Sequence, residues 1–463
     1  MKIKNLEINE HFKVEGYWHI VPLINENREH NNVDDWVFGI LKKDQYGIFL
    51  TVYSDDFYDR QERYEVAQIN YIYGLTQKGE RITLKNLKRV NLKENFPGFP
   101  VYEYIIQEVF VGDFILNTTL FSEVKFSFKF LDLWIKQNID KRSGDFNNEL
   151  KKYKVRKINI NNNLKIFDGI SLKANTNNPI KYQVKTKKFL VLSSKKNLFL
   201  DEINFEFRKL WLFLNTIISH YITFDYISYK LVNGNKVTKF FKQDEHLEKQ
   251  NLTNIPSFED CYSRMEYALT KWFNNPDFYL LLSKDLFKPK GYRYYLDNFH
   301  VEQIRSIEVF HREVYSSNHI DVKEDRDKLL EFINNEIENK EYFKERIEYK
   351  GEISLRNRLT EILYSLPMDL QEKIRKNYNQ QKNTNRGLNK SLKSFINKLV
   401  DDRNNYVHNN LIEEVPELKE KYKYLFEESL LLQSIIRYLI LRDIGFTDNL
   451  LLSNDNYYPK IKE

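Results

Sequence analysis

The sequence predicts an α+β protein, in which an N-terminal antiparallel β-rich domain is followed by an all-α helical bundle. Over the first 200 residues, short runs alternate between apolar and polar residues, which is the period of half-buried strands. From about Phe258 onward, apolar residues recur every three or four positions, as they do in helices packed on a core. We therefore expect a β-rich domain over residues 1–255 and a helical region over residues 256–463.

The strand prediction depends on four segments, namely Val37–Tyr53, Tyr71–Leu84, Glu123–Phe130 and Ile180–Leu192. Glu123–Phe130 is the clearest, because a valine and three phenylalanines occupy every second position, with lysines and a serine between them. Tyr71–Leu84 is typical of a hairpin, with Gly79 in its turn. Together these segments predict an antiparallel sheet.

Helices are expected on both sides of the predicted boundary. Asp201 is a candidate N-cap for a helix whose apolar residues continue to Ile217, and Ile222–Tyr229 then returns to the sheet. The later helical segments are Phe258–Trp272, Tyr292–Val314, Arg326–Ile347, Ile353–Leu366, Lys390–His408 and Pro416–Ile444, the last followed by Gly445 at a helix end. The expected linkers are Asn138–Asn148, Ser316–Asp325 and Tyr378–Asn389.

Composition excludes several classes of protein. The chain has 463 residues with little glycine or proline, which excludes a disordered or collagen-like chain. A single cysteine, Cys261, excludes an internal disulfide framework and a cysteine-based zinc finger, and it fits a reducing cytosol. The first residues are charged and lack the apolar core of a signal peptide, and the apolar stretch Leu425–Phe446 contains glutamates and arginines. We therefore expect a cytoplasmic protein that makes no contact with a membrane.

Charge is distributed unevenly along the chain. The formal net charge is only +6, but residues 136–198 contain 16 Lys and Arg against 4 Asp and Glu. Residues 371–400 contain 8 against 1. Two basic stretches in a nearly neutral protein indicate contact with nucleic acid, because neutralisation of phosphates drives such binding. A lysine-rich solvated face is the alternative that charge alone leaves open.

The candidate chemical site lies in the segment Phe395–Asn410. In a helix, Arg403 continues an apolar stripe at a position where valine or leucine is expected, and a guanidinium rarely occupies such a position without a partner. Asn404 and His408 are four residues apart and therefore lie on one face of the helix. The spacing Arg-Asn-x-x-x-His occurs once in the chain, and it gathers a permanent cation, an amide and a titratable imidazole at a helix end.

This set of side chains suits cleavage of RNA without a metal. Histidine can exchange protons near neutral pH with the 2′-hydroxyl or the leaving 5′-oxygen. Arginine offers a fixed fork of donors to the phosphate, where negative charge builds in the transition state. The alternative is purely structural: His408 at a helix C-terminus, Asn409 or Asn410 as a cap, and Arg403 paired with a buried carboxylate.

The same residues resemble a known family. Arg403-Asn404-x-x-x-His408 near the end of a helical region resembles the motif of HEPN ribonucleases, and Tyr295–Arg312 resembles the early helix of the ApeA-like HEPN domain. The N-terminal half is similar to the β-rich N-terminal domain of ApeA abortive-infection proteins. The resembling pieces are Gly16–Trp18, Phe38–Leu41, Ile72–Gly74, Ile82–Leu84 and Leu131–Trp134.

The resemblance implies an antiphage abortive-infection protein whose HEPN domain, over about residues 290–446, cleaves RNA without a metal or cofactor. It implies Arg403 as the phosphate-binding residue, His408 as the acid/base and Asn404 as their support, with tRNA as a candidate substrate and 2′,3′-cyclic phosphate ends. A homodimer or higher homo-oligomer, with both motifs lining one composite cleft, is implied as well. The β-rich domain would respond to a phage protein trigger or restrain the nuclease.

Further residues are assigned supporting roles. Within the basic stretch, Arg386, Lys390, Lys393 and Lys398 are the candidate RNA-binding residues. Glu308 would orient Arg403 across the bundle, although an i, i+4 salt bridge with Arg312 explains it equally well. Tyr406 would stack on a base.

A metal site and a non-catalytic function are the two alternatives for this helical region. Asp401 and Asp402, with Glu413 and Glu414, set no coordination geometry, so we expect solvated charges and no metal site. A non-catalytic HEPN-like module that binds nucleic acid or a protein partner is the competing function, with the Arg-Asn-x-x-x-His residues acting only in the fold.

Overall fold

The structure is a computed structural model. In it the chain folds into two compact units. It describes residues 2–20, 36–53, 68–93, 98–136, 154–175, 183–219, 221–243, 256–284, 286, 296–315, 323–338, 340, 354–407 and 418–448. The first unit comprises residues 1–215, 221–250 and 257–274, and the second comprises 216–220, 251–256 and 275–463. Each unit is described by itself below.

The first unit is built on one antiparallel sheet, whose strands are separated along the chain by short turns or by other segments. In chain order the strands are β1 (Phe12–Ile20), β2 (Val37–Asp44), β3 (Gly47–Tyr53), β4 (Gln68–Thr76), β5 (Arg81–Lys93), β6 (Val101–Val111), β7 (Leu120–Phe128), β8 (Lys157–Asn159), β9 (Leu164–Asn175), β10 (Gln183–Phe199), β11 (Phe224–Leu231) and β12 (Lys236–Phe241). They are ordered β3-β2-β1-β4-β5-β6-β12-β11-β7-β10-β9-β8.

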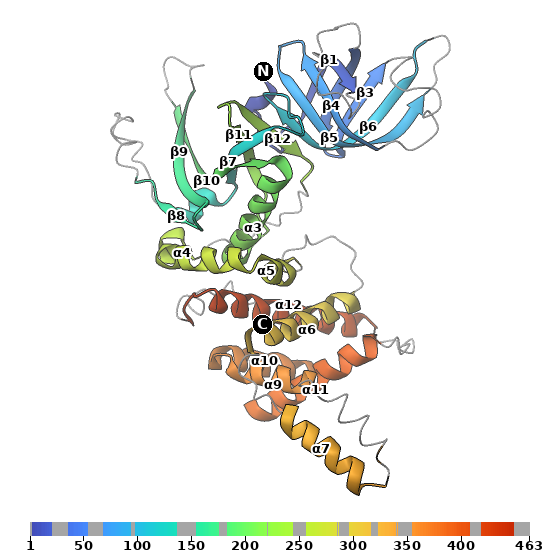
Figure 1. Cartoon of the computed structure of the whole chain (residues 1–463), viewed down its shortest axis with the longest axis vertical. Helices are drawn as coiled ribbons and strands as arrows, with labels where there is room; N and C mark the ends of the chain where they lie inside the picture. Colours follow the sequence, from blue (N-terminus) through green and yellow to red (C-terminus); the bar gives the residue numbers. More distant parts are fainter. Residues whose placement is uncertain are drawn as a thin grey trace. The chain divides into compact units, whose positions relative to one another are not determined.

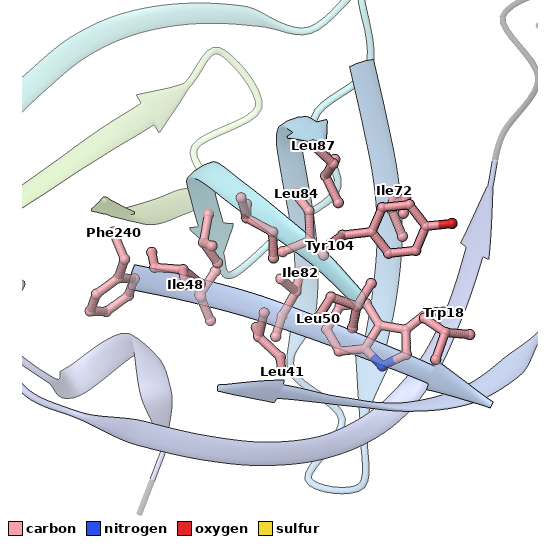
Figure 2. Packing of buried hydrophobic residues seen from close by; sticks show 14 of the residues in the cluster. Trp18, Leu41, Ile48, Leu50, Ile72, Ile82, Leu84, Leu87, Tyr104 and Phe240 are labelled. Carbon is pink, nitrogen blue, oxygen red and sulfur yellow. The ribbon is translucent and has the colours of Figure 1, made fainter. Parts of the chain in front are cut away.

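Strands β1 to β6 close into a barrel, because β3 also pairs with β6 at the other end of the run (Figure 1). The register places Phe49 opposite Ile105 and Tyr53 opposite Val101. Closure leaves β3 without an unpaired edge, which removes a site of unwanted strand addition. The inward side chains form one apolar core, shown in Figure 2, which includes Trp18 and Phe240.

Trp18 is fully buried in this core, and two glycines make room for it. The indole lies against Gly39 of β2 and Gly74 of β4, and a Cβ at Gly74 would overlap the ring. At Gly39, a Cβ would lie 2.8 Å from the indole Cδ1. Three sequence pieces that resemble the ApeA domain therefore meet at one packing site inside the barrel.

Helices complete the first unit. They are η1 (Ile3–Asn5), α1 (Leu131–Trp134), most of α3 (Leu200–Ile218) and α4 (Phe258–Asn274). The side chain of Arg156 fastens α4 to the sheet, since it lies 2.6 Å from Asp168 of β9 and 2.7 Å from Glu259 of α4. The expected domain boundary at residues 255 and 256 precedes α4, and this helix belongs to the sheet-containing unit.

The second unit is helical in its described part. Its helices are α5 (Pro276–Ser283), α6 (Leu296–Tyr315), α7 (Lys323–Glu336), α9 (Leu355–Ser365), α10 (Met368–Gln381), α11 (Leu388–Val407) and α12 (Leu418–Asp443). Helix α6 packs against α9, α11 and α12, and α10 packs against α11. The apolar faces meet in a core that includes Ile304, Leu363, Leu399 and Leu432, all fully buried.

The predicted fold class is confirmed, as are most of the predicted elements. Val37–Tyr53 and Tyr71–Leu84 are hairpin segments, and Gly79 has the positive φ of 71° that its turn requires. The expected return to the sheet after α3 is strand β11. The predicted linker Asn138–Asn148 lies outside the described residues.

Several details differ from the sequence prediction. Helix α7 begins at Lys323, inside the predicted linker Ser316–Asp325. Asp201 lies inside the first turn of α3, where its carboxylate lies 2.6 Å from the ammonium of Lys85. The predicted linker Tyr378–Asn389 is shorter than expected, because α10 continues to Gln381 and buries Tyr378. Helices α5 and α10 were not predicted, since α5 is short and α10 is rich in polar residues.

The apolar stretch Leu425–Phe446 is a packed helix, as predicted. It lies almost entirely in α12, and Leu432, Ile435 and Ile440 on it are at most 1% exposed. Within the described ranges, none of the helices combines the length and the apolar character needed to cross a bilayer.

Candidate functional site

The candidate site is carried by α11, which buries one face and exposes the other. Leu392, Phe395, Ile396 and Leu399 follow helical spacing and are all buried in the second unit. Lys390, Lys393 and Asn404 lie on the opposite side and are exposed. The apolar stripe fixes the rotation of α11 about its axis, and it thereby sets the direction in which each polar residue points.

Arg403 lies at the C-terminal end of the buried stripe and is half-buried. Its Nη1 donates a hydrogen bond of 3.3 Å to Oδ1 of the exposed Asn404. The structure therefore brings together the arginine and asparagine of the motif. A guanidinium has five N–H donors, so this bond uses only part of the capacity of Arg403 to bind an anion.

The rest of the motif is only partly described. His408 follows the last described residue of α11 and lies outside the described residues. Tyr406 belongs to α11, but its side chain is outside the description. The roles of these two residues stay predictions from the sequence.

Lys398 does not lie with the exposed cations. Its ammonium is 2.8 Å from Oδ2 of Asp402, one turn along α11, and 2.5 Å from Oε2 of Glu428 on α12. Burial by itself lowers the pKa of Lys398, but Glu428 and Asp402 outweigh burial and raise it. Lys398 was predicted from the sequence to bind RNA. In the structure its ammonium is instead neutralised by the carboxylates of Asp402 and Glu428.

Asp402 is held inside this cluster rather than solvated, which corrects the expectation for it. Burial by itself would raise the pKa of Asp402. The nearby His300 and Lys398 lower it by a larger amount, so the pKa of Asp402 is below its ordinary value. His300, on α6, is fully buried, and its Nε2 lies 3.4 Å from Oδ2 of Asp402 and 3.7 Å from Oε1 of Glu428. Four ionisable groups from three helices therefore meet beside the motif.

The remaining candidate RNA-binding residues are exposed, as RNA binding requires. Lys390 and Lys393 lie on the outer face of α11. Arg386, just before the helix, is exposed and donates a hydrogen bond of 2.9 Å to Oγ of Ser394. At about 1.5 Å per residue, Lys390 and Asn404 are about 21 Å apart along α11, so a bound strand could follow this face.

Glu308 joins two arginines of the second unit. Its Oε1 lies 2.9 Å from Nη2 of Arg312, one turn along α6, and 3.2 Å from Nη1 of Arg358 on α9. The predicted local salt bridge is confirmed. A role of Glu308 toward Arg403 stays a prediction.

The buried cluster on α6, α11 and α12 was not predicted from the sequence. A weak signal was present in Glu428, which lies in an otherwise apolar run, and in the i, i+4 spacing of Lys398 and Asp402. No sequence pattern links these residues to His300, because helices pair through tertiary packing.

Family models match both halves of the chain. The model of ApeA N-terminal domain 1 matches residues 13–262, more than half of the chain. The chain belongs to the ApeA family. In this ApeA-family protein, the Apea-like HEPN model matches residues 301–450, which contain Arg403, Asn404 and His408. No curated protein and no solved structure matches the chain.

Membership in this family suggests a nuclease role in antiphage defence. HEPN nucleases generally act on RNA and often form dimers. The region that matches the HEPN model also contains Lys398, Asp402 and Glu428 of the buried cluster, and His300 immediately precedes it.

Proposed function

We propose that this ApeA-family protein is an antiphage abortive-infection ribonuclease, which cleaves RNA internally without a catalytic metal and leaves 2′,3′-cyclic phosphate ends. The observation that carries the proposal is the Arg403–Asn404 pair at the exposed end of α11, within the part of the chain that matches the HEPN model. tRNA is the first candidate substrate, and a phage protein is the candidate trigger.

In this mechanism the 2′-oxygen of one nucleotide attacks the adjacent phosphorus. The bond between phosphorus and the 5′-oxygen breaks, the 2′-hydroxyl loses a proton and the leaving 5′-oxygen gains one. The guanidinium of Arg403 offers charged donors to the non-bridging oxygens, where negative charge increases in the transition state. Its hydrogen bond to Asn404 supports a fixed orientation of that fork.

His408 is proposed as the proton-transferring residue. A single imidazole cannot take and give a proton at the same moment, so a concerted reaction requires a second group. A homodimer would supply the second group, since each copy would bring its own Arg403 and His408 to a composite cleft. Tyr406 is proposed to stack on a base beside the scissile bond.

Exposed cations on the same helix are proposed to hold the RNA backbone. Lys390, Lys393 and Arg386 are exposed on or just before α11, at a distance from the motif that several nucleotides can span. Lys398 would act differently from the other three, because its ammonium is paired with Asp402 and Glu428. We propose that it supports the end of α11 and does not contact RNA.

The test is cleavage of labelled tRNA and of a mixed RNA pool by the purified full chain in the presence of EDTA. We expect loss of at least about 100-fold in rate for Arg403→Ala and His408→Ala, since proton transfer and phosphate charge stabilisation each contribute at that level. Arg305→Ala, which removes an arginine with a 69% exposed side chain from α6, is the matched control. A DNA strand of the same sequence should stay intact, because it lacks the 2′-hydroxyl.

The same variants separate catalysis from a non-catalytic binding module. Catalysis predicts that His408→Ala keeps its melting temperature and its RNA affinity while cleavage is lost. A binding module predicts that the unmodified chain retains RNA without cutting it, and that both substitutions lower the melting temperature. Cleavage that continues unchanged in His408→Ala would remove the assigned role.

A further inference from the structure

Three side chains from α6, α11 and α12, namely His300, Asp402 and Glu428, point to one another inside the second unit. Nε2 of His300 is 3.4 Å from Oδ2 of Asp402 and 3.7 Å from Oε1 of Glu428, and one ligand atom from each residue lies within 4.8 Å of the other two. Ligand atoms at about 2.1 Å from a tetrahedral metal ion are about 3.4 Å apart. The two distances from Nε2 of His300 are therefore close to the separation of ligands around one ion.

The hydrogen bonds around His300 place a proton on its Nδ1. Ser429 donates its hydroxyl proton to the carbonyl of Leu425 at 2.7 Å, so its Oγ must accept from Nδ1 of His300 at 3.1 Å. A neutral His300 is therefore protonated on Nδ1 and presents a lone pair at Nε2. This is the arrangement of a metal-binding histidine, whose other ring nitrogen is held by a second group.

In this neutral form, the lone pair of Nε2 faces the carboxylate oxygens of Asp402 and Glu428. Both Nε2 of His300 and Oε1 of Glu428 are fully buried and make no hydrogen bond to any described residue. A buried carboxylate oxygen without a partner is costly, and a nitrogen lone pair facing it adds repulsion. A positive species between the two atoms would satisfy both.

We propose that His300, Asp402 and Glu428 bind a divalent transition-metal ion, of the Zn²⁺ or Mn²⁺ class, which joins α6, α11 and α12. Imidazole together with carboxylates suits these ions, and a buried site with few ligands disfavours Mg²⁺, which keeps its waters. The ligand atoms of His300 and Glu428 are closed to solvent, so the ion has a structural role and does not touch RNA.

The ammonium of Lys398 competes with a metal ion for the carboxylates of this site. Its ammonium bonds Oδ2 of Asp402 and Oε2 of Glu428, so it neutralises part of the charge that would attract the ion. Its side chain is 24% exposed and can turn toward solvent when the ion binds. Removal of this positive charge should strengthen metal binding, because two cations at such a distance repel one another strongly.

The test measures binding directly, on the full chain without a histidine tag and after treatment with chelator. The probes are Zn²⁺ and Mn²⁺, with Mg²⁺ for comparison, and the readouts are bound metal per chain and melting temperature. We expect one equivalent of bound Zn²⁺ or Mn²⁺, a higher melting temperature, and affinity at least about tenfold higher for Lys398→Met. His300→Gln and Glu428→Gln should each weaken binding at least about 100-fold.

His311→Gln is the matched control, because it removes an equally buried imidazole from α6 whose Nε2 is already bonded to Glu361 at 2.7 Å. It should bind metal like the unmodified chain. Circular dichroism confirms that each variant is folded before metal is added. If neither the unmodified chain nor Lys398→Met binds Zn²⁺ or Mn²⁺, the positive species at Nε2 is a proton and the proposal is wrong.

Discussion

The ammonium of Lys398 lies 2.5 Å from Oε2 of Glu428, a carboxylate that is completely buried in the helical unit. The two residues come from α11 and α12, and they tie the end of the motif-bearing helix to its neighbour. A buried ion pair of this kind adds little stability compared with apolar residues, but it is costly to break from one side. Removal of one partner should therefore cause a loss of stability large enough to measure.

Lys398→Met should lower the free energy of unfolding by about 3–5 kcal/mol, because it leaves a buried carboxylate without its cation. The measurement is urea unfolding with chelator present, so that no metal ion replaces the lost charge. Lys393→Met, on the exposed face of the same helix, should change stability by at most about 0.5 kcal/mol. Equal stability of the two variants would show that Glu428 does not depend on Lys398.

Arg358 and Arg312 share Glu308 but differ in burial, with side chains 7% and 52% exposed. Arg358→Ala should cost about 2–3 kcal/mol, since it removes a charged hydrogen bond from a buried position. Arg312→Ala should cost less than about 1 kcal/mol, as exposed ion pairs do. Thermal unfolding measures both, and a larger loss for Arg312→Ala would contradict the assignment.

Gly74→Ala should destabilise the barrel by about 1–3 kcal/mol or more, because the new methyl group overlaps the buried indole of Trp18. Gly387→Ala is the control, since a Cβ there meets no other atom within 4 Å. Denaturant unfolding followed by circular dichroism measures the loss of stability in each variant. Unchanged unfolding of Gly74→Ala would mean that the indole can move aside.

Asp113 should make the β-rich unit sensitive to acid. Burial by itself would raise the pKa of Asp113. Hydrogen bonds from Asn235, Arg81 and the backbone of Phe114 lower it by a larger amount, so the pKa of Asp113 is below its ordinary value. A carboxyl whose folded pKa is lowered contributes stability above its unfolded pKa of about 3.9, and this contribution is lost as the pH falls through the folded value. Unfolding of the β-rich unit should therefore become easier below about pH 4.

Asp113→Asn should reduce that pH dependence, at the cost of lower stability at neutral pH. Glu15→Gln removes an exposed carboxylate from β1 and should keep the slope of the unmodified chain. Unfolding curves at several values between pH 3 and pH 7 give the slope for each variant. Parallel curves for Asp113→Asn and the unmodified chain would exclude Asp113 as the source.

RNA affinity should depend on salt through the exposed cations of α11. If Lys390 and Lys393 each neutralise one phosphate, each substitution by glutamine should reduce the slope of log affinity against log salt by about 0.7, the value for single strands. Fluorescence anisotropy with labelled RNA, using His408→Ala to prevent cleavage, measures the slope. Lys398→Gln should leave it unchanged, because that ammonium is paired inside the protein.

Most of the fold could be predicted because its signals are local. The alternation of Val124, Phe126 and Phe128 identifies a strand from its own residues, and the spacing of Leu392, Ile396 and Leu399 identifies a helix in the same way. The polar helix α10 was missed because its apolar residues are too few to show a period. Asp402 was misjudged because its burial depends on α6 and α12, which lie elsewhere in the sequence.

The sequence by itself determined that strands precede helices, that the chain resembles the ApeA family, and that Arg403, Asn404 and His408 form the motif. Each of these features depends on residues that are close together in the sequence, so it can be recognised without knowing which distant residues they contact. Only the tertiary structure decided that β3 closes on β6, that Gly39 and Gly74 accommodate Trp18, and that His300 meets Asp402 and Glu428. Such contacts join residues far apart along the chain, and packing and burial select them only when the whole core forms.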